Sequence, residues 1–142
     1  MKIVDANVLL YAVNEDAPLH LKAKEWLEGT LSGSEPVGFD WTVLLAFLRL
    51  STRASIFPHP LTAAQAIGTI RAWLEQPCAE ILDPAEAHLD VLEKLLQPFG
   101  SAGNLVSDAH LAALSLEFGA ELCSCDLDFS RFPGVRWINP LA

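Results

Sequence analysis

The chain has 142 residues, of which 51% are apolar and 19% charged, and this is enough to bury a core. We therefore expect one domain spanning residues 1–142. The net charge of −9 argues against a protein that binds nucleic acid mainly through a basic surface, although a bound cation could supply local positive charge. No apolar run reaches the ~18 residues of a membrane span, no basic leader precedes the first apolar segment, and three cysteines fit a reducing compartment, so we expect a cytoplasmic protein.

The first half of the chain predicts two strands and three helices. A short apolar strand over residues 3–6 carries Asp5 near its end. Apolar residues at helical spacing predict a helix over residues 19–28, and a brief strand is expected at 37–39. Asp40 has the character of an N-cap for the apolar helix that follows, and Thr62 with Gln65 has the spacing of a capping box for the third.

In the second half of the chain, predicted strands again alternate with predicted helices. Asp83 is expected to cap a helix that runs to Leu96, and Ser107 to cap another that Gly119 closes. Strands are expected at residues 78–82, 121–125 and 135–139. Strands alternating with helices predict an α/β fold with a short, mostly parallel sheet of four to five strands between two helical layers.

Aspartates follow the ends of separate predicted strands. Asp5 follows the first, and Asp126 and Asp128 follow the 121–125 strand, while Asp108 opens the helix before it. In open parallel sheets functional groups collect beyond the carboxyl ends of the strands. Crowded carboxylates need a proton or a cation, and oxygen ligands favour Mg²⁺ or Mn²⁺ over zinc. Taken singly, Asp108 also fits a helix N-terminal charge, and the pair after the strand fits a turn.

Other chemistries have less support. Cys123 and Cys125 alternate along one strand face and are expected to pack in the core, and the four histidines show no spacing typical of zinc ligands. No phosphate-binding glycine loop or nucleophile elbow is present. An aspartyl phosphotransfer enzyme built on Asp5 would want a lysine late in the chain, whereas the last one is Lys94.

Three segments resemble PIN-domain ribonucleases, and more closely the VapC-type toxins of bacterial type II toxin–antitoxin systems. They are MKIVDANVLLYAVN at the start, FLRL at residues 47–50, and SDAHLAALSLEFGAELCSCDLDFSRFPGVRWINP at 107–140. The last is the most specific, because an aspartate, a helix, a strand and a double aspartate follow one another in the family's order.

The resemblance implies a PIN-like α/β/α sandwich and an Mg²⁺- or Mn²⁺-dependent endoribonuclease, in which water attacks the phosphorus of an RNA phosphodiester with help from the metal. It also implies a homodimer and a cognate small antitoxin, with DNA contacted only through that antitoxin and no membrane association.

The same resemblance assigns roles to residues of this chain. The family's catalytic and metal-binding aspartates match Asp5, Asp108 and Asp126. Asp128 matches an aspartate that often accompanies them as a further ligand, and Asn7 and Ser107 match supporting polar positions. Arg49 is a candidate contact for RNA or antitoxin, although on so apolar a helix it could instead pair with a carboxylate.

One position departs from the family pattern. Many members carry a glutamate just before the apolar-Leu-Arg stretch, where this chain has Ala46. Asp40 lies six residues earlier, about 9 Å along a helix, and cannot simply replace it. A second metal ion is therefore in doubt, and a catalytically weakened PIN-like module that acts through its antitoxin–DNA complex is the alternative reading.

Overall fold

A five-stranded sheet forms the centre of the computed structural model, which describes residues 1–142. Its strands are β1 (Lys2–Val4), β2 (Val37–Phe39), β3 (Ala79–Ile81), β4 (Glu121–Cys123) and β5 (Arg136–Ile138). All neighbours pair in parallel, in the order β3-β2-β1-β4-β5. The predicted α/β class and the short parallel sheet are confirmed.

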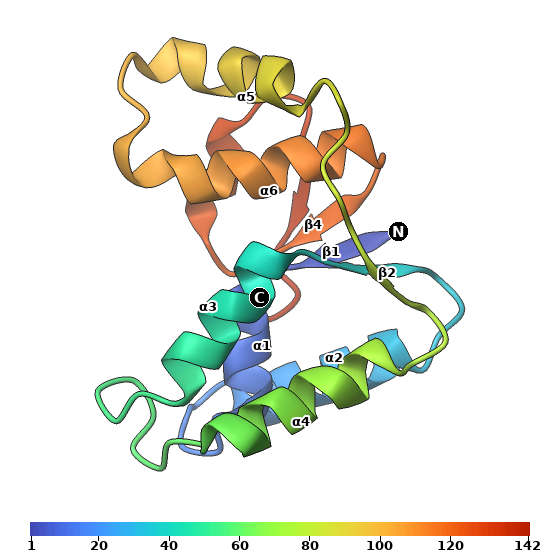
Figure 1. Ribbon diagram of the computed structural model, residues 1–142, viewed down its shortest axis with the longest axis vertical. Coiled ribbons are helices and arrows are strands. Elements are labelled where there is room, and N and C mark those ends of the chain that lie inside the picture. The colour runs from blue at the N-terminus through green and yellow to red at the C-terminus, as the bar shows by residue number, and fades with distance from the viewer.

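Six α-helices cover the two faces of this sheet. They are α1 (Ala6–Val13), α2 (His20–Leu31), α3 (Trp41–Ser51), α4 (Ala63–Leu74), α5 (His88–Leu96) and α6 (Val106–Glu117). Short 3₁₀ helices η1 (Gln97–Phe99), η2 (Gly103–Leu105) and η3 (Leu127–Arg131) lie between them. In Figure 1, α5 and α6 lie on one side of the strands and α1 to α4 on the other, so the molecule has three layers. No helix combines the length and apolarity needed to cross a membrane.

The core consists of apolar side chains between the sheet and both helical layers. Ile3 and Val4 of β1 and Leu122 of β4 are completely buried, as expected for central parallel strands covered on both faces. On the α3–α4 side, the ring of Phe47 packs edge-on against Trp73 at 4.8 Å between centroids. The strands and helices that carry the polar residues below are therefore held by a dry, packed interior.

The strand order reverses between β1 and β4. The chain runs outward from β1 through β2 to β3, and then crosses back to place β4 on the other side of β1. At such a switch point the two connections leave in opposite directions and open a crevice beyond the strand ends. Because Val4 is in register with Cys123, the residues that follow them, Asp5 and Ser124, emerge side by side.

Helix boundaries follow the predicted caps in the first half of the chain. Asp40 caps α3 by accepting a hydrogen bond from the amide of Thr42, and Thr62 with Gln65 forms the predicted capping box of α4. Asp5 is itself an N-cap: it ends β1 and begins α1, a helix that the sequence had not indicated.

Three boundaries differ from prediction. Helix α5 begins at His88 rather than after Asp83, because the amide of Ala85 is taken by the carboxylate of Glu117 instead of entering a helix. Helix α6 begins at Val106, continuing directly from η2, so Ser107 lies inside its first turn and is not its cap. Helix α2 runs through Gly29 to Leu31. Gly119, at φ +60°, closes α6 as expected.

Candidate active site at the carboxyl ends of β1 and β4

Asp5 occupies the position where β1 meets α1. Its Oδ1 accepts a hydrogen bond from the amide of Ala6 at 2.7 Å, which is the cap of the helix. Its Oδ2 accepts the hydroxyl of Ser124 at 2.7 Å. The amide of Ala6, just after β1, and the hydroxyl of Ser124, just after β4, therefore orient the Asp5 carboxylate before any ligand binds.

Ser124 connects the polar residues at the switch point, and the sequence reading missed it. Its completely buried hydroxyl, besides donating to Asp5, accepts hydrogen bonds from Asn7 Nδ2 at 3.1 Å and from the amide of Asp126 at 3.0 Å. Asn7 completes the link by accepting the amide of Cys125 at 3.2 Å. The signal was present in the sequence: a serine directly after a buried strand, flanked by cysteines and followed by an aspartate.

Three further carboxylates gather next to this network. Asp126 caps η3 by accepting the amide of Asp128 at 2.9 Å, and Asp108 lies in the first turn of α6. One oxygen from each of Asp108, Asp126 and Asp128 lies within 4.8 Å of the others. The four aspartates predicted from the sequence thus come from three separate segments to one edge of the sheet.

Burial and the neighbouring negative charges raise the pKa of two of these carboxylates, Asp108 and Asp5. Burial, together with the charges of Asp126, Asp5 and Asp128, raises the pKa of Asp108 from 3.8 to about 6. Burial also raises the pKa of Asp5, against the opposing effect of its hydrogen bonds from Ser124 and Ala6. The negative charge of such a cluster is compensated either by a proton on one carboxylate or by a bound cation.

Two of the carboxylates, Asp5 and Asp108, line a cavity of about 270 Å³. Its lining includes Asp5 itself, a wall on α6 with Ser107 and Asp108, and a wall of residues from α3. Ser107 lines the cavity beside Asp108 and donates no hydrogen bond to a carboxylate, and its supporting role stays a prediction. Arg49, exposed on the α3 wall, forms no ion pair, which leaves its guanidinium free to face a phosphate rather than a carboxylate of the protein.

The donor set suits a hard divalent cation. All the candidate ligands are carboxylate oxygens, which Mg²⁺ and Mn²⁺ prefer. The nearby thiols offer no alternative: Cys123 is completely buried, and its burial raises the pKa of the thiol to about 12. Cys125 is partly buried against the core, as predicted, and burial raises its pKa as well. A soft-metal thiolate site is disfavoured here.

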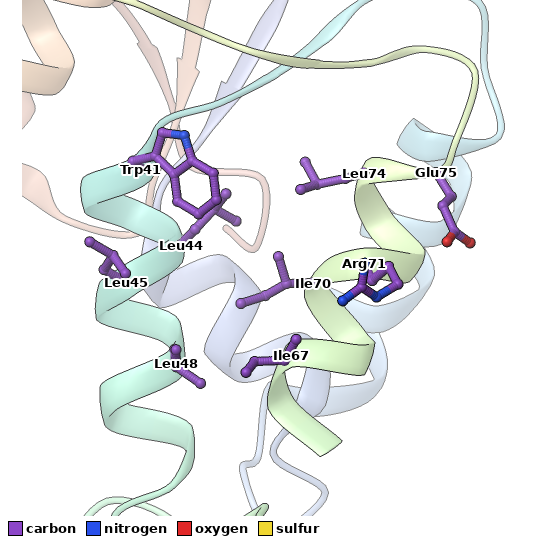
Figure 2. A pocket seen from close by; sticks show the side chains of 9 residues that line it. All are labelled: Trp41, Leu44, Leu45, Leu48, Ile67, Ile70, Arg71, Leu74 and Glu75. Atoms are coloured by element: carbon purple, nitrogen blue, oxygen red, sulfur yellow. The ribbon is translucent and has the colours of Figure 1, made fainter. Parts of the chain in front are cut away.

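A larger, apolar cavity of about 500 Å³ lies between α3 and α4. Figure 2 shows Leu48 of α3 facing Ile67 and Ile70 of α4 across it, with Trp41 and Leu74 at one end. Leu45 lines both this groove and the carboxylate cavity, so the two hollows adjoin along α3.

Replacing Asp108 by Asn should remove a pH-dependent penalty in metal-free protein. Its folded-state pKa of about 6 exceeds the ordinary value of 3.8, so between these values the folded state keeps a proton that the unfolded chain has released. Wild-type stability therefore falls as pH rises through this window. In EDTA, the Tm of the variant should match wild type near pH ~4 and exceed it increasingly towards pH ~7. A Tm difference independent of pH would contradict the assigned repulsion.

Replacing Ser124 by Ala should weaken divalent-ion binding without touching a proposed ligand. The variant leaves Asp5 Oδ2 without its 2.7 Å donor and frees Asn7 and the loop to Asp126. Loss of such an outer hydrogen bond lowers metal affinity about 10- to 100-fold, measurable by Mn²⁺ titration calorimetry. The exposed Ser32→Ala is the matched control. Equal affinities for both variants would remove Ser124 from the site.

Comparison with known proteins places the chain in a family. A PIN domain matches residues 2–135. The sequence is 51% identical over 142 residues to "Ribonuclease VapC37" of Mycobacterium tuberculosis, covering 100% of this chain and 99% of that one. It is 40% identical over 141 residues to "Ribonuclease VapC33" of the same species, covering 99% of each.

Solved structures of similar fold include VapBC2 of Rickettsia felis bound to a promoter DNA fragment, with a TM-score of 0.71, 20% identity and 97% of each chain covered. Mycobacterium tuberculosis VapC20, described as a toxin that cleaves the sarcin–ricin loop, has a TM-score of 0.63 at 21% identity, with 96% of this chain and 99% of that chain covered. With a parallel sheet, carboxylates at its switch point and relatives that match over their whole length, this chain belongs to the PIN-domain family, among the VapC ribonucleases.

Proposed function

We propose that this chain, as a single domain over residues 1–142, is the toxin of a type II toxin–antitoxin pair. It acts in the cytoplasm as an Mg²⁺- or Mn²⁺-dependent endoribonuclease that hydrolyses RNA phosphodiester bonds. The observation that carries the proposal is the convergence of Asp108, Asp126 and Asp128 within 4.8 Å, beside the oriented carboxylate of Asp5.

In this proposal the chain's residues divide the work. Asp5, Asp108 and Asp126 hold the cation and are the catalytic carboxylates, and Asp128 is a further ligand. When bound, a divalent ion supplies positive charge beside the phosphodiester and makes water more acidic. Ser124 and Asn7 keep Asp5 in place through their hydrogen bonds.

In this proposal the α3 wall of the cavity binds the RNA substrate. Arg49 lines the same cavity as Asp5 and Asp108 and is free of ion pairs, so it can contact a phosphate oxygen of the RNA. Arg49 supplies positive charge locally, beside the cavity, in a chain whose net charge is −9.

Purified protein should cleave RNA with Mg²⁺ or Mn²⁺, and EDTA should stop it. Asp5→Asn keeps the size of the side chain but removes its charge from the cluster, so we expect cleavage to fall by at least about 100-fold. Asp83→Asn, at an exposed carboxylate without hydrogen bonds, is the matched control and should cleave like wild type. Cleavage that survives both EDTA and Asp5→Asn would rule out the mechanism.

One observation favours a second candidate. Because α3 carries Ala46 in the cavity wall, no carboxylate comes from that side, and a second ion has fewer ligands. A weakened PIN-like module would act only through its complex with antitoxin and DNA. It predicts tight antitoxin binding but no metal-dependent cleavage even at stoichiometric protein, so the same assay separates the two candidates.

The proposed partners are a homodimeric copy of the chain and a cognate antitoxin, with DNA contacted through the latter. Support for the antitoxin comes from structural neighbours solved as VapBC pairs. We place an apolar segment of the antitoxin in the α3–α4 groove, from which it reaches the carboxylate cavity past Leu45.

A charge in this groove should prevent antitoxin binding. Ile67 is 43% exposed and lines the groove, so Ile67→Glu places a carboxylate where an apolar side chain would dock. We expect the affinity for the cognate antitoxin, measured by titration, to fall by at least about 10-fold. Leu89→Glu, at a 77% exposed residue of α5 outside the groove, is the control. Undiminished binding by Ile67→Glu would place the antitoxin elsewhere.

A further inference from the structure

The two walls of the carboxylate cavity are not tied together by the proposed metal ligands. Asp108 lies on the α6 wall, whereas the α3 wall presents Thr42, Ala46 and Arg49. With alanine at position 46, a cation held by the aspartates has no ligand on α3. Some other interaction has to fix the distance between Arg49 and the carboxylates.

Four side chains from α5, α6 and the cap of α3 form a hydrogen-bonded row. Glu117 Oε2 lies 2.5 Å from His88 Nδ1, His88 Nε2 lies 2.9 Å from His110 Nδ1, and His110 Nε2 lies 3.1 Å from Asp40 Oδ2. The carboxylates at the two ends are almost inaccessible, with side-chain exposures of 6% for Glu117 and 5% for Asp40. This row could not be predicted from the sequence, because it joins residues from α5, α6 and the cap of α3.

The row continues into the cavity wall. Asp40 Oδ2, which accepts His110, also accepts the amide of Thr42 at 3.0 Å and its hydroxyl. Thr42 lines the carboxylate cavity, and His110 lies two residues after Asp108 on α6. The bond between Asp40 and His110 is the only hydrogen bond that joins α3 or its cap to α6.

We propose that the Asp40–His110 hydrogen bond is a brace that sets the spacing between the α3 and α6 walls of the active site. Asp40 and His110 are then positioning residues: they touch neither substrate nor metal, but hold Arg49 and Thr42 at the right distance from Asp108. This inference rests on the proposed function and extends it.

The physical reason is the burial of the pair. A carboxylate this inaccessible requires its partners, so removing His110's donor leaves Asp40 with only Thr42 and drives it towards water. Because Asp40 is the N-cap, the first turn of α3 moves with it. Displacements of this kind disturb alignment of the reacting groups more than they disturb overall binding.

Two substitutions at one position separate the brace from the rest of the row. In His110→Gln the side-chain amide nitrogen replaces Nε2, so the contact with Asp40 is kept and the contact with His88 is lost. In His110→Asn the amide group replaces Nδ1, so the contact with His88 is kept and the brace is lost. Asp40→Ser provides a second route, because serine still caps α3 but is too short to reach His110.

We expect His110→Asn and Asp40→Ser to lower kcat for RNA cleavage by about 10-fold or more, whereas His110→Gln stays within about 2-fold of wild type. KM for RNA should change by less than about 2-fold, since RNA binding is spread over many phosphates. The Mn²⁺ dissociation constant from calorimetry should also stay within about 2-fold, because no proposed ligand lies on α3.

Hydrogen exchange supplies a readout that does not depend on RNA. Backbone amides of residues 41–46 should exchange faster in His110→Asn and Asp40→Ser, but not in His110→Gln. If wild-type protein fails to cleave RNA, the proposed function is wrong and the exchange data alone decide on the brace. Equal exchange and equal kcat in the Asn and Gln variants would overturn it, as would a loss of Mn²⁺ affinity in His110→Asn that Gln does not share.

Discussion

The structure depends on one electrostatic constraint, which is that several carboxylates emerge together where the parallel strands β1 and β4 end. Strand order makes this unavoidable, because β1 and β4 are adjacent and their connections diverge at that point. Burial, together with the repulsion from the neighbouring carboxylates, raises the pKa of Asp108 to about 6. The fold tolerates it by fixing Asp5 through Ser124 and the α1 amide, and the packed strands beneath leave these groups little room to separate. Carboxylates held this close together favour the binding of a divalent cation.

Much of this arrangement could be predicted from the sequence. Asp5 directly follows a short apolar strand and Asp126 comes soon after another, and strands alternating with helices predict a parallel sheet whose carboxyl ends share an edge. The caps at Asp40 and Thr62 were predictable for the same reason: a local hydrogen bond between a side chain and an amide two or three residues later needs no tertiary partner. Features that depend only on residues close together in the chain, such as helix caps, can therefore be predicted from the sequence.

What could not be predicted depends on tertiary contacts. Helix α1 was not predicted because its residues, ANVLLYAV, are apolar on nearly every side and show no helical periodicity. The start of α5 is shifted by Glu117, which lies on another helix and takes the amide of Ala85. His88 and His110 lie 22 positions apart on separate helices, and only the packing of α5 on α6 brings His88 Nε2 within 2.9 Å of His110 Nδ1. The role of Ser124 depends on contacts with Asp5 and Asn7, which lie more than 100 positions earlier in the chain.

These features suggest that the active site is built from two parts with different tasks: an edge of carboxylates for the cation and an α3 wall for the substrate and the antitoxin. The most direct test of the central claim is a crystal of the protein grown in Mn²⁺, examined by anomalous scattering. We predict a peak in contact with Asp5, Asp108 and Asp126 beyond the ends of β1 and β4. An empty site there at saturating Mn²⁺, with Asp5 turned away from the other two carboxylates, would contradict the account.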